Sequence, residues 1–193
     1  MTTRQQEREY TWEDLEKAVG QDFSGGVIVK GADKVDEGWI RRFCEVLEMD
    51  CPLFHDDKVA KAHGYKGIPA PISMINSTLT RPAAWKPGQP SQWPDADVNR
   101  VFGPQPEESR VVPLPKPKTT RGFATDIEIE YLKPVYAGDQ LEVRGRKLVN
   151  VTVRETSVGF GAFTISESEI YNQRGEKVAV QRNGGYAYNP KAK

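Results

Sequence analysis

The sequence has few cysteines and no long apolar run, and both absences restrict what it can encode. Its 193 residues contain two cysteines, Cys44 and Cys51, which form no Cys-x-x-Cys pair and have no suitably spaced histidine. Neither a disulfide framework nor a zinc site is therefore expected. No window approaches the roughly 18 apolar residues of a membrane-spanning helix, and residues 1–9 lack the apolar stretch of a signal peptide. We expect a soluble protein of the reducing cytoplasm that has no membrane partner.

The sequence also has no excess of positive or negative charge. The chain has 27 Lys and Arg residues against 27 Asp and Glu residues, so its formal net charge is zero. Without a basic field, nucleic-acid binding is not expected. Gly159-Phe160-Gly161 lacks the third glycine and the following helix of a phosphate-binding loop, and no ligand cluster suggests a metal. We expect no metal and no cofactor, and a single domain over residues 1–193.

Helical patterns dominate the first part of the chain. Apolar residues between Asp36 and Pro52 recur at spacings of about three and four, the period of one buried helical face, and Asp36 suits the N-cap. Residues 56–64 have the pattern of a second helix, and residues 72–79 that of a buried third one. The apolar positions of the first helix are Trp39, Ile40, Phe43, Cys44, Val46 and Leu47.

Proline then interrupts the pattern. Nine of the 14 prolines fall between Arg81 and Lys118, where no helical or strand period exists. This composition predicts a proline-rich insertion or arm. Trp85 and Trp93 within it are candidate interface anchors, or they pack the arm onto its own domain.

Strand patterns fill the rest of the sequence. Ile127, Ile129 and Tyr131 alternate with acidic residues, as in a half-buried antiparallel strand, and residues 172–175 are typical of a hairpin turn. The chain is therefore predicted to be α+β, with one long helix packed on a curved antiparallel sheet. The edges of such a sheet need a cover, either a second subunit or the proline-rich arm.

Two helical segments and two strand segments together carry a family resemblance. Residues 40–57 and 60–71 resemble the MaoC-like hydratase and dehydratase family of the hotdog fold, in its N-terminal-half or FAS1-like dehydratase type. Residues 129–141 and 171–176 are similar to that family's strand, Gly-Asp turn and hairpin. The resemblance implies a hotdog domain that works as a pair, binds acyl-CoA thioesters and adds water across a 2-enoyl double bond.

Active members of the family carry the motif Asp-x-Asn-Pro-x-His-x-Asp, because hydration needs groups that take a proton from water and deliver one to carbon. If Cys51-Pro52 is aligned with Asn-Pro without a gap, Met49 takes the place of the acid and Phe54 that of the histidine. Neither side chain can transfer a proton. This alignment matches more positions of the family pattern than the alternative does, and we favour it.

A one-residue slip gives an alternative alignment. Asp50 and His55 have the same separation as the catalytic pair, and Asp57 then matches the last acid of the motif. The slip misplaces Pro52 and Ala60. Asp50 and His55 are therefore the candidate catalytic residues of this chain, unless a partner chain supplies the pair.

The resemblance thus implies the non-catalytic subunit of a heteromeric enoyl-CoA hydratase, beside an active MaoC-like partner. In this hypothesis Met49, Phe54 and Ile72 line a wide tunnel for a bulky acyl group such as a steroid side chain or a long fatty acyl chain; alternatively they only fill the core. The complete set of candidate substrate-binding residues is Met49, Phe54, Tyr65, Gly67, Pro71 and Ile72.

Two other interpretations stay open. The chain could be a self-sufficient homodimeric hydratase that uses Asp50 and His55, or a hotdog protein that binds or hydrolyses acyl thioesters. Lys116, Lys118 and Arg121 are the densest basic residues that could meet the CoA phosphates, unless they belong to a solvated loop.

Overall fold

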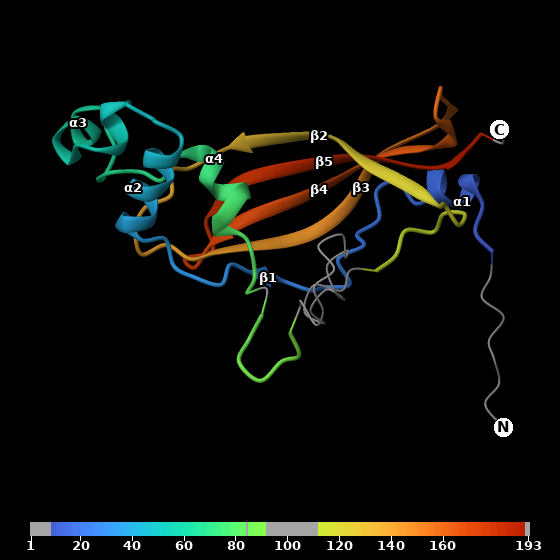
Figure 1. Cartoon of the computed structure of the whole chain (residues 1–193), viewed down its shortest axis with the longest axis horizontal. Helices are drawn as coiled ribbons and strands as arrows, with labels where there is room; N and C mark the ends of the chain where they lie inside the picture. Colours follow the sequence, from blue (N-terminus) through green and yellow to red (C-terminus); the bar gives the residue numbers. More distant parts are fainter. Residues whose placement is uncertain (1–8, 84, 92–111, 192–193) are drawn as a thin grey trace.

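The computed structural model describes residues 9–83, 85–91 and 112–191, and places short helical elements before a long-stranded sheet (Figure 1). The helical elements are α1 (Trp12–Lys17), α2 (Glu37–Val46), the 3₁₀ turn η1 (Pro52–Phe54), α3 (Asp57–Ala62), α4 (Ile72–Met74) and the π-helical η2 (Ile75–Leu79). The strands are β1 (Val29–Lys30), β2 (Arg121–Tyr131), β3 (Leu141–Glu155), β4 (Gly159–Asn172) and β5 (Lys177–Pro190).

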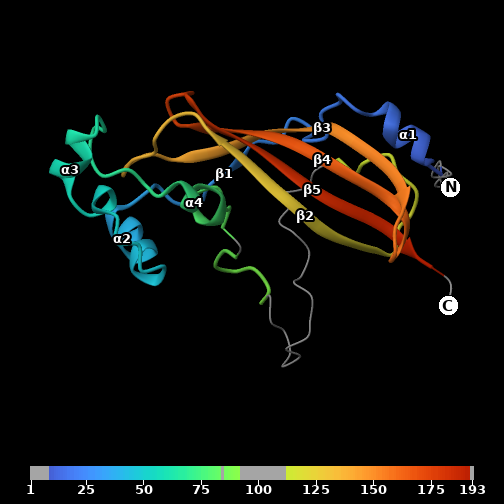
Figure 2. The same ribbon diagram turned by 90° about the horizontal axis from the view of Figure 1, so that it is seen from above.

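The five strands form one antiparallel sheet in the order β1-β3-β4-β5-β2. The sheet is strongly curled, with α1 near one end and α2, α3 and α4 near the other (Figure 2). The predicted α+β class with a curved antiparallel sheet is therefore confirmed. β2 and β1 are the two edge strands, and β1 is only two residues long.

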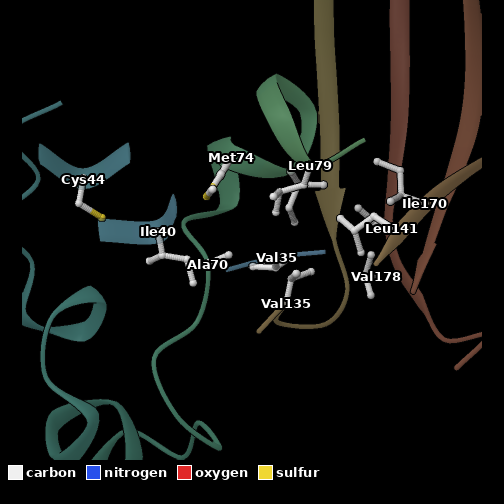
Figure 3. Packing of buried hydrophobic residues seen from close by; sticks show 12 residues of the cluster. Val35, Ile40, Cys44, Ala70, Met74, Leu79, Val135, Leu141, Ile170 and Val178 are labelled. Atoms are coloured by element: carbon white, nitrogen blue, oxygen red, sulfur yellow. The ribbon is translucent and has the colours of Figure 1, made fainter. Parts of the chain in front are cut away.

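A first hydrophobic core lies where the helical elements meet the sheet (Figure 3). Ile40 and Cys44 of α2 and the segment Ile72–Leu79 provide its helical side, so two short helical elements do the packing that we expected of one long helix. Each fully buried aliphatic side chain in such a core contributes about 1.5–3 kcal/mol. The sheet and its loops supply Val135, Leu141, Ile170, Val178 and Ala179.

The α2 helix follows directly from its sequence. The Asp36 carboxylate accepts hydrogen bonds from the backbone N–H groups of Gly38 and Trp39, which makes Asp36 the predicted N-cap. Ile40 and Cys44 are one turn apart and both buried. The helix ends because Glu48 adopts a positive φ of 50°, which turns the chain back toward the core.

The helical segment over the sheet changes geometry along its length, and its hydroxyl groups bond to its own carbonyls. Pro71 precedes Ile72, and the side chains of Ser77, Thr78 and Thr80 donate to main-chain carbonyls one turn earlier. Such side-chain bonds compete with the regular helical ladder. The helix has α geometry up to Met74 and π geometry from Ile75 to Leu79.

A second, smaller core lies at the opposite end of the sheet. α1 is capped by reciprocal bonds between Thr11 and Asp14, and its buried Leu15 and Ala18 pack with Leu148 and Ala162 of the sheet. The long strands β3 and β4 thus connect two separate cores.

Glycine is required where β4 meets β5. A Cβ on Gly161 would lie 2.2 Å from the carbonyl oxygen of Ala187, so only glycine allows this close approach of the two strands. A Cβ on Gly159 would likewise lie 2.1 Å from the carbonyl oxygen of Asn189, so the two strands approach closely at both glycines.

The described parts of the proline-rich segment, residues 81–83, 85–91 and 112–118, contain neither helix nor strand. The indole N–H of Trp85 is within hydrogen-bond distance of the carbonyls of Gln89 and Pro90, inside the same segment. Trp93 lies outside the described residues, so its expected anchoring role is not addressed. Across the described residues, no helix has both the length and the apolar character needed to cross a membrane.

Candidate functional site

The motif positions lie on the turn that links α2 to α3. The 3₁₀ turn Pro52–Phe54 starts at a proline, whose fixed φ suits the first position of a helical turn. Met49 and Phe54 are both partly buried and pack against the first core. The two side chains that occupy the acid and histidine positions in the gap-free alignment therefore contact apolar residues.

His55 is held by a backbone carbonyl. Its Nε2 lies 2.6 Å from the carbonyl oxygen of Met49. A carbonyl oxygen only accepts, so Nε2 must carry the proton of this hydrogen bond, and in the neutral ring Nδ1 keeps its lone pair. The imidazole is exposed but has a defined orientation.

Asp50 is not bonded to His55. The Asp50 side chain is exposed, and the described residues provide no hydrogen bond or ion pair between the two groups. Asp57, the third member of the slipped alignment, forms an ion pair with Lys61 one turn along α3. The acid and the base that the slipped alignment would combine thus make no direct bond with each other in the described residues.

A cavity of about 330 Å³ opens beside His55. Phe54, Ile40 and Ile68 provide apolar walls, while His55 and Arg41 bring polar groups to it. The Arg41 guanidinium is also paired with Glu45 on the outer face of α2. The lining residues are Glu37, Gly38, Ile40, Arg41, Phe54, His55 and Ile68.

The other predicted substrate-binding residues lie on the segment after α3. Pro71 is buried, Tyr65 and Gly67 are partly buried, and Ile72 is 57% exposed at the start of α4. Of the candidate substrate-binding residues, only Phe54 lines the cavity, and Met49 and Phe54 share the first core. Ile72 points to the surface and is not one of the buried core residues.

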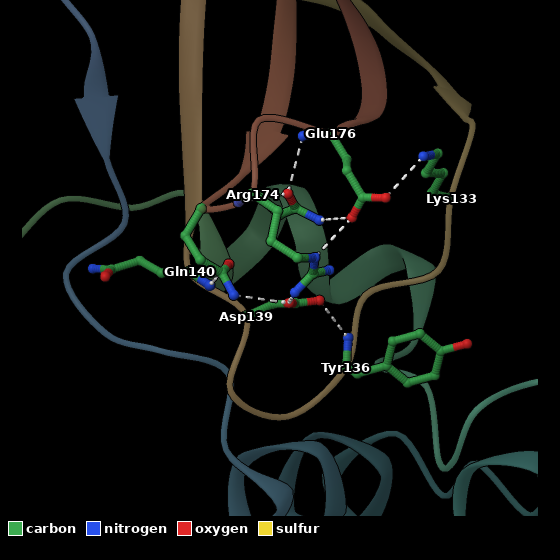
Figure 4. Close-up of polar contacts among 8 residues, drawn as sticks. Lys133, Tyr136, Asp139, Gln140, Arg174 and Glu176 are labelled. Atoms are coloured by element: carbon green, nitrogen blue, oxygen red, sulfur yellow. Dashed lines mark hydrogen bonds and ion pairs between the residues drawn. The ribbon is translucent and has the colours of Figure 1, made fainter.

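A polar network anchors this segment to the sheet (Figure 4). Asp139 is only 3% exposed and accepts hydrogen bonds from Arg174 Nη1 at 2.6 Å, Gln173 Nε2 at 3.2 Å and the backbone N–H of Tyr136 at 3.0 Å. The hydroxyl of Tyr136 in turn accepts from the backbone N–H of Lys66. The segment after α3 is thus tied through Tyr136 to a buried carboxylate that lies more than 70 positions after Lys66 in the sequence.

Glu176 extends the same network at the β4–β5 hairpin. Hydrogen bonds from Asn172, Lys133 and Arg174 lower the pKa of Glu176 to about 2. Sequence analysis treated the Gly-Asp turn and the Asn-x-x-Gly hairpin as separate ordinary turns and missed this network. The two turns carry complementary charges, Asp139 on one and Arg174 on the other, but nothing local in the sequence shows that the turns meet.

The proposed phosphate contacts do not form one cradle in the described chain. Lys116 Nζ donates to Thr119 Oγ1 at 2.6 Å, and burial lowers the pKa of this ammonium group. Lys118 is exposed, and Arg121 begins the edge strand β2. No group of three or more His, Cys, Asp or Glu side chains among the described residues has the geometry to hold a metal ion.

The curled sheet with a short helix over one end is the hotdog arrangement. One chain of the ChsH1-ChsH2 complex from Mycobacterium tuberculosis superposes with a TM-score of 0.62 at 19% identity, covering 94% of this chain and 93% of that one. A MaoC-like dehydratase from Rhodospirillum rubrum superposes with a TM-score of 0.53 at 18% identity, covering 91% and 95%. The predicted fold class is thereby confirmed: the chain has the hotdog fold.

The sequence comparison narrows this class. The chain belongs to the family described as "FAS1-like, dehydratase domain region", which matches residues 18–181. It is 28% identical over 166 residues to a probable enoyl-CoA hydratase alpha subunit from Thermomonospora curvata. That match covers 84% of this chain and 47% of the relative, so the chain spans about half the length of this curated relative. The family resemblance stated from the sequence is therefore confirmed, and the family is of the dehydratase type.

Proposed function

We propose that the chain is the non-catalytic subunit of an enoyl-CoA hydratase that acts on acyl-CoA thioesters. In this proposal an active MaoC-like partner supplies the Asp and His that hold and activate water. The present chain shapes the acyl pocket and completes the hotdog pair. The reaction is the reversible addition of water across a 2-enoyl thioester.

The observation that carries the proposal is the packing of Met49 and Phe54. At the positions that the gap-free alignment assigns to the catalytic acid and histidine, this chain has two side chains that cannot exchange protons and that contact the core. Replacing a buried acid and histidine by apolar residues removes the cost of burying polar groups and stabilises the fold. This exchange supports a subunit that contributes to the structure of the site and not to proton transfer.

The size of the cavity agrees with a shared site. At about 330 Å³ it is near the lower limit of small-molecule sites, which span about 300–1,000 Å³. An acyl-CoA carries a nucleotide, a pantetheine arm and an acyl group, so a single such cavity accommodates only part of it. A relative named as an alpha subunit and a structural neighbour that is a two-protein complex also support a partnered enzyme.

The geometry of His55 favours a second candidate function, a self-sufficient homodimeric hydratase. Its Nε2–H is fixed on the Met49 carbonyl, and its Nδ1 lone pair is free to take a proton beside the cavity. A carbonyl partner of this kind sets the tautomer of a histidine base. Asp50 would have to be brought toward His55 by substrate or by a second subunit.

The test is hydration of a 2-enoyl-CoA by the purified chain alone, followed through the loss of the conjugated thioester absorbance. We expect no turnover above that of buffer, because Met49 and Phe54 cannot transfer protons. Release of free thiol is measured in parallel and would reveal a thioesterase instead. Turnover that appears only when a MaoC-like partner is added would confirm the subunit proposal.

His55→Ala and His63→Ala are the matched pair of variants. Both histidines are exposed and bound to a backbone carbonyl, His55 to Met49 and His63 to Val59, but only His55 lines the cavity. If the chain alone is active and only His55→Ala abolishes the activity, the homodimeric hydratase is correct. Equal activity of the two variants would leave His55 without a catalytic role.

A further inference from the structure

The cavity beside His55 combines apolar walls with two hydrogen-bond acceptors that the fold does not use. Its volume is about 330 Å³, and Ile40, Phe54 and Ile68 form its apolar part. Because a water molecule takes about 30 Å³ in the liquid, this space holds roughly ten non-hydrogen atoms of a ligand. A short alkyl segment with one polar group fits that size.

The first unused acceptor is Glu37, in the first turn of α2. Glu37 lines the cavity and is exposed. Arg41, one turn further along the helix, would be its ordinary partner at this spacing, but the Arg41 guanidinium pairs with Glu45 instead. Among the described residues, Glu37 has no ion pair and no side-chain hydrogen bond. Since Glu45 balances the charge of Arg41, the cavity keeps one net negative charge.

The second unused acceptor is Nδ1 of His55. Nε2–H donates to the Met49 carbonyl at 2.6 Å, so the neutral ring keeps its lone pair on Nδ1, which has no partner in the described part of the chain. A carboxylate and an imidazole lone pair both accept hydrogen bonds. The cavity is therefore complementary to a ligand that donates, and the N–H groups of Arg41 that Glu45 does not engage are left for an acceptor.

These features decide which part of an acyl-CoA fits the cavity. The nucleotide carries phosphates, whose negative charge Glu37 would repel. The pantetheine arm has more non-hydrogen atoms than the cavity holds. The distal end of an acyl group is apolar, uncharged and short enough. A hydroxyl group on that end would donate to Glu37 or His55 and accept from Arg41, whereas a carboxylate there could only accept.

We propose that this cavity receives the distal end of the acyl group and selects an end with a hydroxyl group over an end with a carboxylate. The inference rests on the proposed function for the acyl-CoA substrate. It adds the class of acyl group that the chain accepts. It also makes Glu37, which lies outside the family motif, a residue that determines specificity.

The two histidines of the chain allow a test with small probes. His55 lines the cavity, whereas His63 is equally exposed and bonded to a backbone carbonyl but lies outside it. Their ring resonances are followed by NMR during titration with hexanol and with hexanoate, which share one alkyl tail. We expect hexanol to shift His55 and not His63. Hexanoate should bind on the order of tenfold more weakly, because Glu37 repels its charge.

Glu37→Gln keeps an acceptor and removes the negative charge. We expect hexanoate to bind this variant several-fold more tightly than the wild type, with the affinity for hexanol almost unchanged. The matched control is Glu16→Gln, the same change at an exposed residue of α1, at the opposite end of the sheet (Figure 2), and it should behave as the wild type. No shift of His55 with hexanol, equal affinities for the two probes, or a preference unchanged in Glu37→Gln would overturn the proposal.

Thioesters test whether the acyl end is the part that enters. We expect ω-hydroxyhexanoyl-CoA to displace hexanol from His55 more effectively than hexanoyl-CoA, and CoA itself to displace none. Displacement by CoA would place the pantetheine arm in the cavity and contradict the assignment. A hydroxyacyl thioester that leaves hexanol bound would contradict it too. None of these measurements records hydration, so failure here leaves the proposed hydratase function to be judged by its own assay.

Discussion

At the scale of single residues, the buried carboxylate of Asp139 joins its own turn to the β4–β5 hairpin through its hydrogen bonds to Tyr136 and Arg174. Asp139→Asn removes the charge that Arg174 contacts and leaves the guanidinium with a weaker acceptor. Hydrogen bonds to charged groups contribute about 1.5–3 kcal/mol, and Arg174 is half exposed. We expect Asp139→Asn to lower the free energy of unfolding in urea by about 1–3 kcal/mol.

The exposed Asp33 provides the control for this prediction. Asp33→Asn makes the same chemical change at a surface residue, and we expect an effect within about 0.5 kcal/mol. If the two variants are equally stable, the Asp139 network does not hold the turn together.

At this scale, local contacts could be predicted from the sequence, whereas the Asp139 network could not. The caps are local, so Asp36 was predicted from its own neighbourhood and confirmed. Arg174 and Asp139 are 35 positions apart, and only the pairing of β3 with β4 brings their turns together. No local pattern contains that information.

At the scale of elements, the β4–β5 hairpin carries a pH-dependent contribution to stability. Glu176 has an ordinary pKa of 4.5, which its partners lower to about 2 in the folded chain. A carboxylate with a lowered folded pKa stabilises the fold above its unfolded pKa, and this stabilisation is lost as the pH falls from about 4.5 to about 2. We expect Glu176→Gln to flatten the dependence of the melting temperature on pH in this window.

Glu142 provides the comparison for the hairpin. Glu142 pairs with Arg144 on the neighbouring strand β3, and Glu142→Gln should leave the dependence below pH 4.5 closer to that of the wild type. Equal slopes for wild type and Glu176→Gln between about pH 4.5 and 2 would contradict the assigned role of Glu176.

The elements themselves were largely predictable because their signals are periodic. The alternation over residues 125–131 predicted part of β2, and the i, i+4 pair Ile40 and Cys44 predicted the buried face of α2. The change from α to π geometry at Ile75 was not predictable, because the apolar spacing of residues 72–79 indicates a helix but does not distinguish these two geometries.

At the scale of the whole molecule, the candidate site was only partly predictable. Alignment to a motif placed Met49, Phe54 and His55 on one turn, and the structure keeps them together. It could not determine that Ile72 turns to the surface, because that depends on the direction in which α4 starts from Pro71. Nor could it reveal two separate cores, since the residues of both lie on the same continuous strands, β3 and β4, with no break in the strand between them.

Because β3 and β4 belong to both cores, we expect the two cores to unfold together. Leu15→Ala creates a cavity in the second core and should cost about 2–5 kcal/mol, whereas Val46→Ala at an 82% exposed position should change stability little. Because β3 and β4 run through both cores, we expect Leu15→Ala to lower the melting temperature at both ends of the sheet equally. Trp12, which contacts Phe160, reports on the second core, and Trp39 on α2 reports on the first.

The measurement is thermal unfolding followed by fluorescence in two versions of the chain, one keeping only Trp12 and the other only Trp39 of its four tryptophans. Coincident transitions at Trp12 and Trp39, before and after Leu15→Ala, are the expected signature of one cooperative unit. An earlier transition at Trp12 alone would mean that α1 and its core open as a separate unit. The sheet would then transmit no stability between its ends, and the first core, which carries the candidate site, would fold independently of the second.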